Sequence, residues 1–427
     1  MTTRHARTSV SLLPLACAIL LPVPWLVLRT QGFQGPPPLV SILAGLAILG
    51  AAFVLSWAAE LLQMDVSQAL ALAVLALIAV LPEYAVDAIF AYQAGRDPVV
   101  AQQGYAVANM TGGNRLLIGL GWSAVVLLAW WRHGAHTVVL DRSQALELGV
   151  LFAATVYALL LPFNGELGLV NTAVLLALFI GYTWATARTP AEEPELTGPA
   201  AQLGQLPATL RRALTAALLV FAAAAIFLSA EPFADSLVET GRELRIDEFL
   251  LVQWLAPLAS EAPEFIVALL FVWHGRAAAG MRTLVSSKVN QWTLLVATLP
   301  LVFSLGAGRL AGMPLVERQQ HELWLTAGQS LFALVLIADG TMHHWEAIAL
   351  LVPFLAQLAL PPAIASVDVR MAFTAGYLLA ALALLLLDAE RRRAVVSCPR
   401  TIRETLGQPA EVPPAVPGGT ASEGGAP

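Results

Sequence analysis

Long apolar stretches recur from one end of the chain to the other. Each stretch is close to or above the roughly 20 residues that a helix needs to cross the hydrocarbon core of a bilayer. Their recurrence predicts an all-α polytopic membrane protein with about 12 transmembrane helices. The twelve segments lie approximately at 10–28, 38–59, 66–94, 99–131, 144–162, 167–187, 210–230, 248–275, 279–306, 321–339, 345–362 and 369–388.

The composition supports this class and excludes others. Hydrophobic residues make up 58% of the 427-residue chain and charged residues only 12%, whereas a soluble protein carries about 25% charged residues. No basic patch with interleaved aromatic residues predicts nucleic-acid binding. The two cysteines, Cys17 and Cys398, are far apart in the sequence, so we expect no disulfide, no cysteine metal site and no cofactor.

Both ends of the chain and its middle differ from the apolar segments. Arg4 and Arg7 precede the first apolar run, as in a signal peptide, but the length of this run favours a retained helix. A stretch rich in proline and glutamate at 188–207 predicts a linker between two halves. The residues 397–427, rich in proline and glycine, predict a disordered tail.

Arginine placement gives an expected orientation for an integral membrane protein. When alternate loops are assigned to two sides, the side with both termini holds 14 arginines and the other side holds 7. Arg115 and Lys288 are left aside, because they lie within predicted segments. Since loops rich in arginine stay in the cytoplasm, both termini are expected there, in a plasma or inner membrane. Without the five arginines near the C-terminus the ratio is 9 to 7, so these five carry most of the prediction.

Two of the apolar segments carry an acid next to a proline. Pro82-Glu83 in segment three is followed one turn later by Asp87, and Pro263-Glu264 in segment eight follows Glu261. One segment number is odd and the other even, so the two helices cross the membrane in opposite directions. Such helices in corresponding places of two halves predict an inverted repeat with an ion site near the bilayer midplane.

We expect the two prolines to interrupt their helices. Proline removes one backbone hydrogen bond, so the carbonyls of Ile78 and Ala259 become free to act as ligands beside the acids. Two glycines in segment four allow close backbone approach or local unwinding. The predicted helix breaks are therefore Pro82, Pro263, Gly112 and Gly113.

The acids on each helix share one face, because Glu83 and Asp87 are spaced i, i+4 and Glu261 and Glu264 are spaced i, i+3. Carboxylates near the bilayer midplane need a counter-charge. Calcium suits them because it takes about six to eight oxygen ligands. Neutral oxygens for the same ion are expected from Asn109, Asn114, Ser260, Asn290 and Gln291.

Two alternatives to this ligand set stay open. The amides could instead connect helices by hydrogen bonds, as polar side chains do in membranes. Asp87 or Glu261 could form a structural salt bridge with Arg115 or Lys288. If all these groups are charged, four acids less these two cations leave two negative charges, which one divalent cation balances.

These residues resemble the repeat motifs of the calcium/cation antiporter superfamily, the membrane family of sodium/calcium exchangers. The two Pro-Glu pairs match the Pro-Glu elements of its two alpha repeats. Residues 108–114 (ANMTGGN) match the following glycine- and asparagine-rich string closely, and residues 282–288 (RTLVSSK) match it loosely. The resemblance implies that Glu83 and Glu264 bind the transported metal ion directly. It also implies two inverted five-helix halves with one extra helix at each end.

The resemblance sets the expected boundaries of the units. The first repeat covers 38–187, with its motif at 78–121, and the second covers 208–362, with its motif at 256–300. The other units are the extra helices at 1–37 and 363–396, the linker at 188–207 and the cytoplasmic tail at 397–427.

Several positions depart from the family pattern, among them Ala79, Val80, Asp87 and Glu261. Leu117 and Gln291 stand where the motifs have asparagine or aspartate, and Lys288, the only lysine in the chain, stands where the second string has asparagine. An ammonium group can take the place of a bound monovalent ion. The hypothesis is therefore that a sodium position is lost and that Lys288, with Glu261 or Asp87, couples transport to protons.

The leading interpretation is a secondary antiporter that exchanges a divalent cation, with Ca²⁺ favoured, for Na⁺ or H⁺ by alternating access. Two alternatives on the same fold are a Na⁺/H⁺ antiporter and a transport-inactive sensor or scaffold. An intramembrane enzyme is disfavoured, because His321-Glu322 lacks the second histidine of a zinc motif. The expected partners are small cations and the lipid bilayer, and the sequence predicts no particular oligomeric state.

Overall fold

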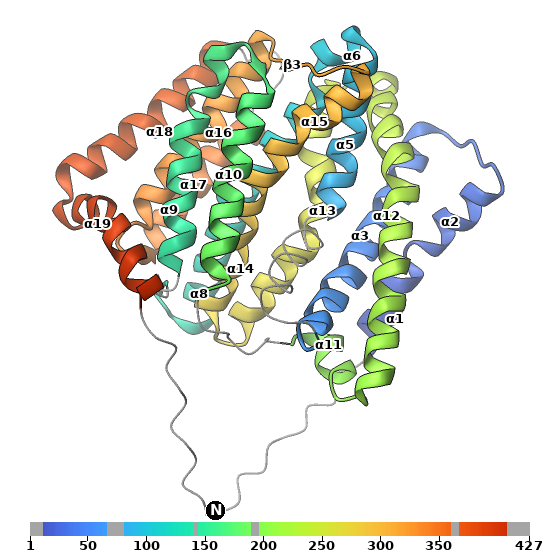
Figure 1. Cartoon of the computed structure of the whole chain (residues 1–427), viewed down its shortest axis with the longest axis horizontal. Helices are drawn as coiled ribbons and strands as arrows, with labels where there is room; N and C mark the ends of the chain where they lie inside the picture. The colour runs from blue at the N-terminus through green and yellow to red at the C-terminus, as the bar shows by residue number, and fades with distance from the viewer. Residues whose placement is uncertain (1–11, 66–80, 141–143, 189–195, 360–366, 408–427) are drawn as a thin grey trace, which may run out of the picture.

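The computed structural model describes residues 12–65, 81–140, 144–188, 196–359 and 367–407, most of them helical (Figure 1). The helices of the first half are α1 (Leu13–Leu20), α2 (Val23–Thr30), α3 (Pro37–Gln63), α5 (Leu81–Arg96), α6 (Pro98–Gln103), α7 (Tyr105–Leu116), η1 (Leu117–Trp122), α8 (Ser123–His133), α9 (Ala145–Ala158), η3 (Leu161–Asn164) and α10 (Leu169–Thr186). Those of the second half are α11 (Gly198–Leu203), α12 (Ala208–Leu244), α13 (Glu248–Trp273), α14 (Ala277–Asn290), η4 (Gln291–Leu295), α15 (Val296–Ala307), α16 (Glu317–Leu336), α17 (His344–Ala359), α18 (Val367–Leu387) and α19 (Ala389–Gly407).

Each of the twelve predicted apolar segments coincides with a helix in the described ranges. Within these ranges, nine helices or continuous helical runs are long and apolar enough to cross a membrane. The α5 helix is described only from Leu81, because the start of the third predicted segment, 66–80, lies outside the described residues. The helical membrane architecture is confirmed, and the number 12 stays a prediction.

Helices of one half of the chain pack against helices of the other half. The α3 helix lies along α12, its counterpart in the second half (Figure 1). The acid-bearing α5 packs against α15, and the acid-bearing α13 packs against α7. Each therefore contacts the helical run that follows its counterpart, which is Ala277–Ala307 for α5 and Pro98–His133 for α13. This exchange of equivalent partners is typical of two repeats related by a pseudo-two-fold axis, and it confirms the inverted repeat.

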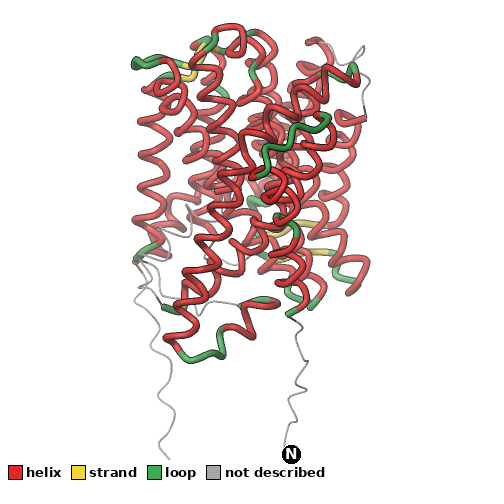
Figure 2. Tube along the Cα trace, turned by 90° about the vertical axis from the view of Figure 1, so that its right-hand side faces the viewer, coloured by secondary structure: helices red, strands yellow, loops and turns green. Residues whose placement is uncertain are grey.

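Four short strands also pair between the two halves. They are β1 (Thr137–Val139), β2 (Glu166–Leu167), β3 (Met313–Pro314) and β4 (Thr341–His343). The β1 strand pairs antiparallel with β4, and β2 pairs antiparallel with β3. Figure 2 shows the two pairs in separate places on the helix bundle. Since β1 and β3 occupy corresponding places in the two halves, as do β2 and β4, each pairing is the symmetry counterpart of the other.

The predicted helix breaks are wrong at three of the four positions. The α13 helix continues through Pro263, and α7 continues through Gly112 and Gly113. A proline costs one hydrogen bond, and a membrane helix tolerates that loss where neighbouring helices and side chains satisfy the freed backbone group. The irregular backbone comes later, in the π-helical turns η1 and η4, which directly follow α7 and α14. Whether α5 breaks before Pro82, and the predicted role of the Ile78 carbonyl, lie outside the described residues.

The helix α19 corrects the prediction of a disordered tail for residues 397–407. This helix is held at its start by Arg391, which is buried and forms ion pairs with Glu346 and Asp339. Further along, its Ile402 side chain packs closely against Gly149 of α9. A buried charged anchor and a closely packed apolar contact stabilise a helix that its polar sequence alone does not predict. The remaining tail, 408–427, lies outside the described residues.

The described part of the linker is bound to the end of α3. The backbone N–H and the hydroxyl of Thr197 donate to the two carboxylate oxygens of Glu60, at 2.6 and 2.7 Å. Beyond it, Asp65 lies 2.8 Å from Nη2 of Arg211 and 2.9 Å from Nε of Arg212. The predicted linker 188–207 therefore contains the helix α11 and is attached to α3 through Thr197, while residues 189–195 lie outside the described part.

Substitution of Asp65 is expected to have a pH-dependent effect on stability. The hydrogen bond from Arg211 lowers the pKa of Asp65 to about 2. The folded protein thus favours the ionised carboxylate, so its contribution is present above about pH 4 and is lost as the pH falls through about 2. Asp65→Asn should lower the unfolding temperature of detergent-solubilised protein at neutral pH, with a difference that shrinks in strong acid. The exposed Asp368→Asn is the control, and a difference for Asp65→Asn that does not change with pH contradicts the assignment.

Candidate cation site

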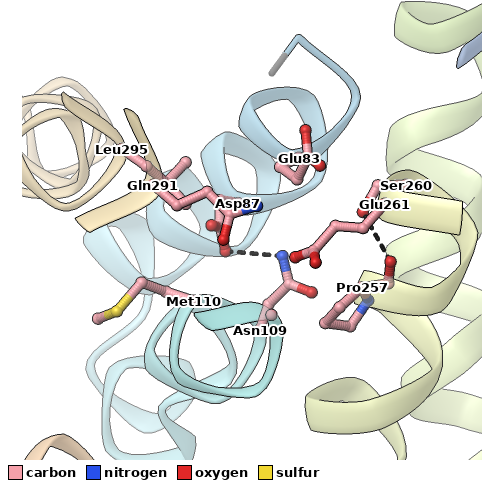
Figure 3. A pocket seen from close by; sticks show the side chains of 10 residues that line it. Glu83, Asp87, Asn109, Met110, Pro257, Ser260, Glu261, Gln291 and Leu295 are labelled. Atoms are coloured by element: carbon pink, nitrogen blue, oxygen red, sulfur yellow. Dashed lines mark hydrogen bonds between the residues drawn. The ribbon is translucent and has the colours of Figure 1, made fainter. Parts of the chain in front are cut away.

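Four helical segments surround a small buried cavity between the two halves (Figure 3). The cavity has a volume of about 10 Å³, which leaves room for about one water-sized particle. Its lining residues come from α5 (Glu83, Asp87), α7 (Asn109, Met110, Gly113), α13 (Pro257, Ser260, Glu261) and η4 (Gln291, Leu295). Seven of these ten residues were predicted from the sequence as ligands or backbone positions of the site.

Carboxylates from both halves meet at this cavity. The exposed fractions are 3% for Glu83, 1% for Asp87 and 1% for Glu261. Figure 3 shows the carboxylates of Asp87 and Glu261 pointing toward each other, with the amide of Asn109 between them. Glu83 interacts electrostatically with Glu264, Glu261 and Asp87. Glu264 is half-buried and is not among the residues that line the cavity.

Several oxygens of the site lack a hydrogen-bond partner on another residue. Asp87 accepts from Nδ2 of Asn109 at 2.9 Å through Oδ1, and its Oδ2 has no partner. Within the described ranges, neither carboxylate oxygen of Glu83 has a partner on another residue, and the Oδ1 atom of Asn109 has none. Buried oxygens of this kind are costly unless they are protonated or face a cation. The chemistry of this donor set therefore suits a hard cation or protons.

Two glycines allow the site helices to approach each other. A Cβ atom at Gly113 would lie 2.2 Å from Oε1 of Glu261, and one at Gly112 would lie 1.8 Å from the carbonyl oxygen of Gln253. The close atom at Gly112 belongs to the backbone, so only glycine fits there, whereas at Gly113 a Cβ atom would displace the Glu261 carboxylate. The close approach expected for these glycines is confirmed, although they do not break the helix.

The acids surround the cavity without converging on a single point. Among the residues that the structure describes, no three aspartate, glutamate, histidine or cysteine side chains are placed to hold one metal ion together. A calcium ion takes about six to eight oxygens at 2.3–2.6 Å. In this conformation the carboxylates of the two halves line one cavity without converging on one point.

Lys288 lies beside the site and has a specific partner. Its Nζ atom donates to Oδ1 of Asn114 at 2.5 Å and lies 4.3 Å from the centre of the Trp292 ring. Lys288 also interacts electrostatically with Glu261. Asn114 and Asn290 are both buried, but neither lines the cavity. The Lys288 ammonium group therefore binds the Asn114 amide oxygen, which was predicted from the sequence to bind a cation.

Arg115 does not face the acids of the cavity, contrary to the role in charge compensation expected for it. Its Nη2 atom lies 2.8 Å from Oε2 of Glu322, and its Nη1 atom donates to Gln357 at 3.2 Å. Arg115 follows Asn114 on α7, and one step along a helix turns a side chain by about 100° toward a different neighbour. The estimate of two net negative charges is therefore wrong, because Arg115 pairs with Glu322 and not with the acids of the cavity. Glu322 and Arg370 were not predicted as neighbours of Arg115, and the available signal was the acid Glu322 at the start of the apolar segment 321–339.

The chain matches the model of a known protein family and a solved structure. The family model described as sodium/calcium exchanger protein matches residues 37–187 and 214–361. The crystal structure of an H⁺/Ca²⁺ exchanger named CAX is 42% identical with a TM-score of 0.86, covering 92% of this chain and 97% of that one.

Two more distant structures share the fold alone. Native YfkE is 14% identical with a TM-score of 0.57, and the alignment covers 86% of this chain and 99% of that one. The sodium-calcium exchanger NCX_Mj is 15% identical with a TM-score of 0.50, and the alignment covers 80% and 99%. A search of curated proteins finds no match.

Proposed function

The chain belongs to the family of sodium/calcium exchanger proteins, and on that premise we propose that it is a secondary antiporter that moves Ca²⁺ in exchange for protons. The observation that carries the proposal is the meeting of Glu83 and Asp87 of α5 with Glu261 of α13 at one buried cavity. The similarity to an H⁺/Ca²⁺ exchanger over 92% of the chain supports the choice of both ions. Carboxylates can bind either Ca²⁺ or protons at the same oxygens, which is the competition that such exchange requires.

The residues of the cavity divide into charged and neutral ligands. Glu83 and Glu261 would hold the ion from opposite halves, with Glu264 joining when α13 moves toward α5. Asn109 supplies the neutral oxygen that has no partner, and Ser260 and Gln291 supply further oxygens from the cavity wall. Alternating access follows from the exchanged packing, because a movement of one half against the other changes which side of the cavity is covered.

Protons are favoured over sodium as the counter-ion because of Lys288. Its ammonium group already binds the amide oxygen of Asn114, where a monovalent cation would otherwise find a ligand. A positive charge at this place would oppose the binding of a second cation beside Ca²⁺. A Na⁺/H⁺ antiporter and a transport-inactive sensor remain the alternatives, and both predict no Ca²⁺ uptake.

We place both termini in the cytoplasm, on the 14 to 7 distribution of arginines.

Ca²⁺ uptake into proteoliposomes tests the proposal. Vesicles that are acidic inside should take up Ca²⁺, and a sodium gradient at equal pH should drive no uptake. Uptake driven by sodium but not by a pH gradient contradicts the choice of counter-ion. The absence of Ca²⁺ uptake under both gradients contradicts the proposed function.

Lys288→Asn is expected to change the coupling ion. The substitution removes the ammonium group from Asn114, and pH-driven Ca²⁺ uptake should fall about tenfold, as for the loss of a hydrogen bond to a charged group of about 1.5 kcal/mol. A sodium gradient should now drive measurable uptake. Lys288→Arg, which keeps the charge, should retain the proton dependence. Unchanged sodium and proton dependence in Lys288→Asn contradicts the role of this residue.

A further inference from the structure

Glu322 is a buried carboxylate on α16 that does not line the cation site. It is 2% exposed. Its Oε1 atom lies 2.8 Å from Nε of Arg370 on α18, and its Oε2 atom lies 2.8 Å from Nη2 of Arg115 on α7. Gln253 on α13 also donates its Nε2 atom to Oε2, at 3.0 Å. One acid thus binds side chains from three other helices.

Two of these three helices carry residues of the cation site. Gln253 lies two turns before Glu261 on α13, and its Nε2 atom also lies within 3.3 Å of the Thr111 hydroxyl on α7. The Gln253 carbonyl oxygen fills the space that a side chain on Gly112 would need. At the next position, Gly113 lies against the Glu261 carboxylate. The Gln253 contact therefore holds together the same two helices whose spacing sets the width of the cavity.

The third helix, α18, lies outside the two repeats and reaches Arg115 by two routes. One route is the ion pair between Arg370 and Glu322, which Arg115 shares. The other runs through Gln357, which donates to the Tyr377 hydroxyl of α18 at 2.9 Å and accepts from Arg115 at 3.2 Å. The cluster holds two arginines and one carboxylate, so the loss of Glu322 would leave two buried positive charges uncompensated, whereas the loss of Arg370 would leave the Arg115–Glu322 pair with one fewer tie to α18.

We propose that Glu322 and Arg370 are positioning residues for the cation site. Through Arg115 and Gln253 they fix α7 against α13, and this sets the separation between Asn109 and Glu261. The inference rests on the proposed function, because it concerns the same site. It makes α18 part of the transport machinery, although this helix lies outside both repeats. Loss of such outer partners typically lowers metal affinity or activity by about 10–100-fold.

Ca²⁺ uptake measured over a range of Ca²⁺ concentrations tests the inference. Arg370→Gln should raise the half-saturating Ca²⁺ concentration by about tenfold or more while the maximal rate stays close to wild type. Arg370→Lys, which keeps a positive charge beside Glu322, should recover most of the affinity. Asp368→Asn, at an exposed position on the same helix, is the matched control and should behave as wild type.

Gln253→Leu provides a second test that removes none of the three charges of the cluster. Like Arg370→Gln, Gln253→Leu should raise the half-saturating Ca²⁺ concentration. The double variant should raise the half-saturating Ca²⁺ concentration by less than the product of the two single effects, since both substitutions act through the Glu322 carboxylate. If Arg370→Gln does not fold, Gln253→Leu decides the test. Calorimetric Ca²⁺ titration of the solubilised protein should show the same loss of affinity.

Two results overturn the inference. One is a wild-type half-saturating concentration in Gln253→Leu and in any folded Arg370→Gln. The other is a lower maximal rate with unchanged half-saturation, which indicates a purely structural cluster. Failure of the proposed function looks different, because then the wild-type protein itself takes up no Ca²⁺.

Discussion

Glu83→Gln is expected to abolish Ca²⁺ uptake while the protein remains folded. Glu83 is buried, neither of its carboxylate oxygens has a partner on another residue, and it interacts electrostatically with the acids of α13. The neutral amide keeps the shape of the side chain but removes the charge that binds Ca²⁺ and the group that accepts a proton. Uptake should fall to about one hundredth of the wild-type rate or lower, because a direct ligand contributes more than an outer partner whose loss costs about 10–100-fold.

The control for this experiment is Glu231→Gln, because Glu231 is an exposed acid on α12. It should transport at the wild-type rate. Since removing one of several crowded carboxylates relieves repulsion, Glu83→Gln should unfold at the wild-type temperature or above it. Wild-type Ca²⁺ uptake in Glu83→Gln would show that Glu83 is not a ligand.

Gly112→Ala is expected to have the second largest effect. The new methyl group would lie 1.8 Å from the backbone carbonyl oxygen of Gln253, and a backbone atom cannot rotate away as a side chain can. The α7 and α13 helices must therefore separate, which widens the cation site and costs about 1–3 kcal/mol or more of stability. Both the unfolding temperature and the Ca²⁺ uptake rate should fall.

Gly181→Ala and Gly376→Ala are matched controls for this substitution. Both glycines lie within helices, and a Cβ atom at either position has no neighbour within 4 Å. Neither variant should lose transport. If Gly112→Ala transports and unfolds as these controls do, the close packing of α7 on α13 is not needed for the site.

The features that the sequence predicted well are those that depend on one helix at a time. Apolar stretches of sufficient length predicted the helices, and the i, i+4 spacing placed Glu83 and Asp87 on one face. The inverted repeat followed from the order of the segments, and the glycine pair correctly indicated close backbone approach. Each of these conclusions rests on the geometry of a helix or on its count along the chain.

The features that the sequence could not provide depend on which helices become neighbours. Nothing near Arg115 in the sequence indicates that Glu322, more than 200 residues later, pairs with it. The contact between Lys288 and Asn114 likewise joins opposite halves of the chain. The rule that proline interrupts a helix is local, and at Pro263 the packing around α13 outweighs it.

The measurement that tests the central claim most directly is an anomalous-scattering map from a crystal of this protein soaked with Ca²⁺. We predict one strong peak in the cavity between α5 and α13, within about 2.3–2.6 Å of carboxylate oxygens from both Glu83 and the second-half acids Glu261 or Glu264. A map without a peak there, or with a peak bound by acids of only one half, would contradict the account.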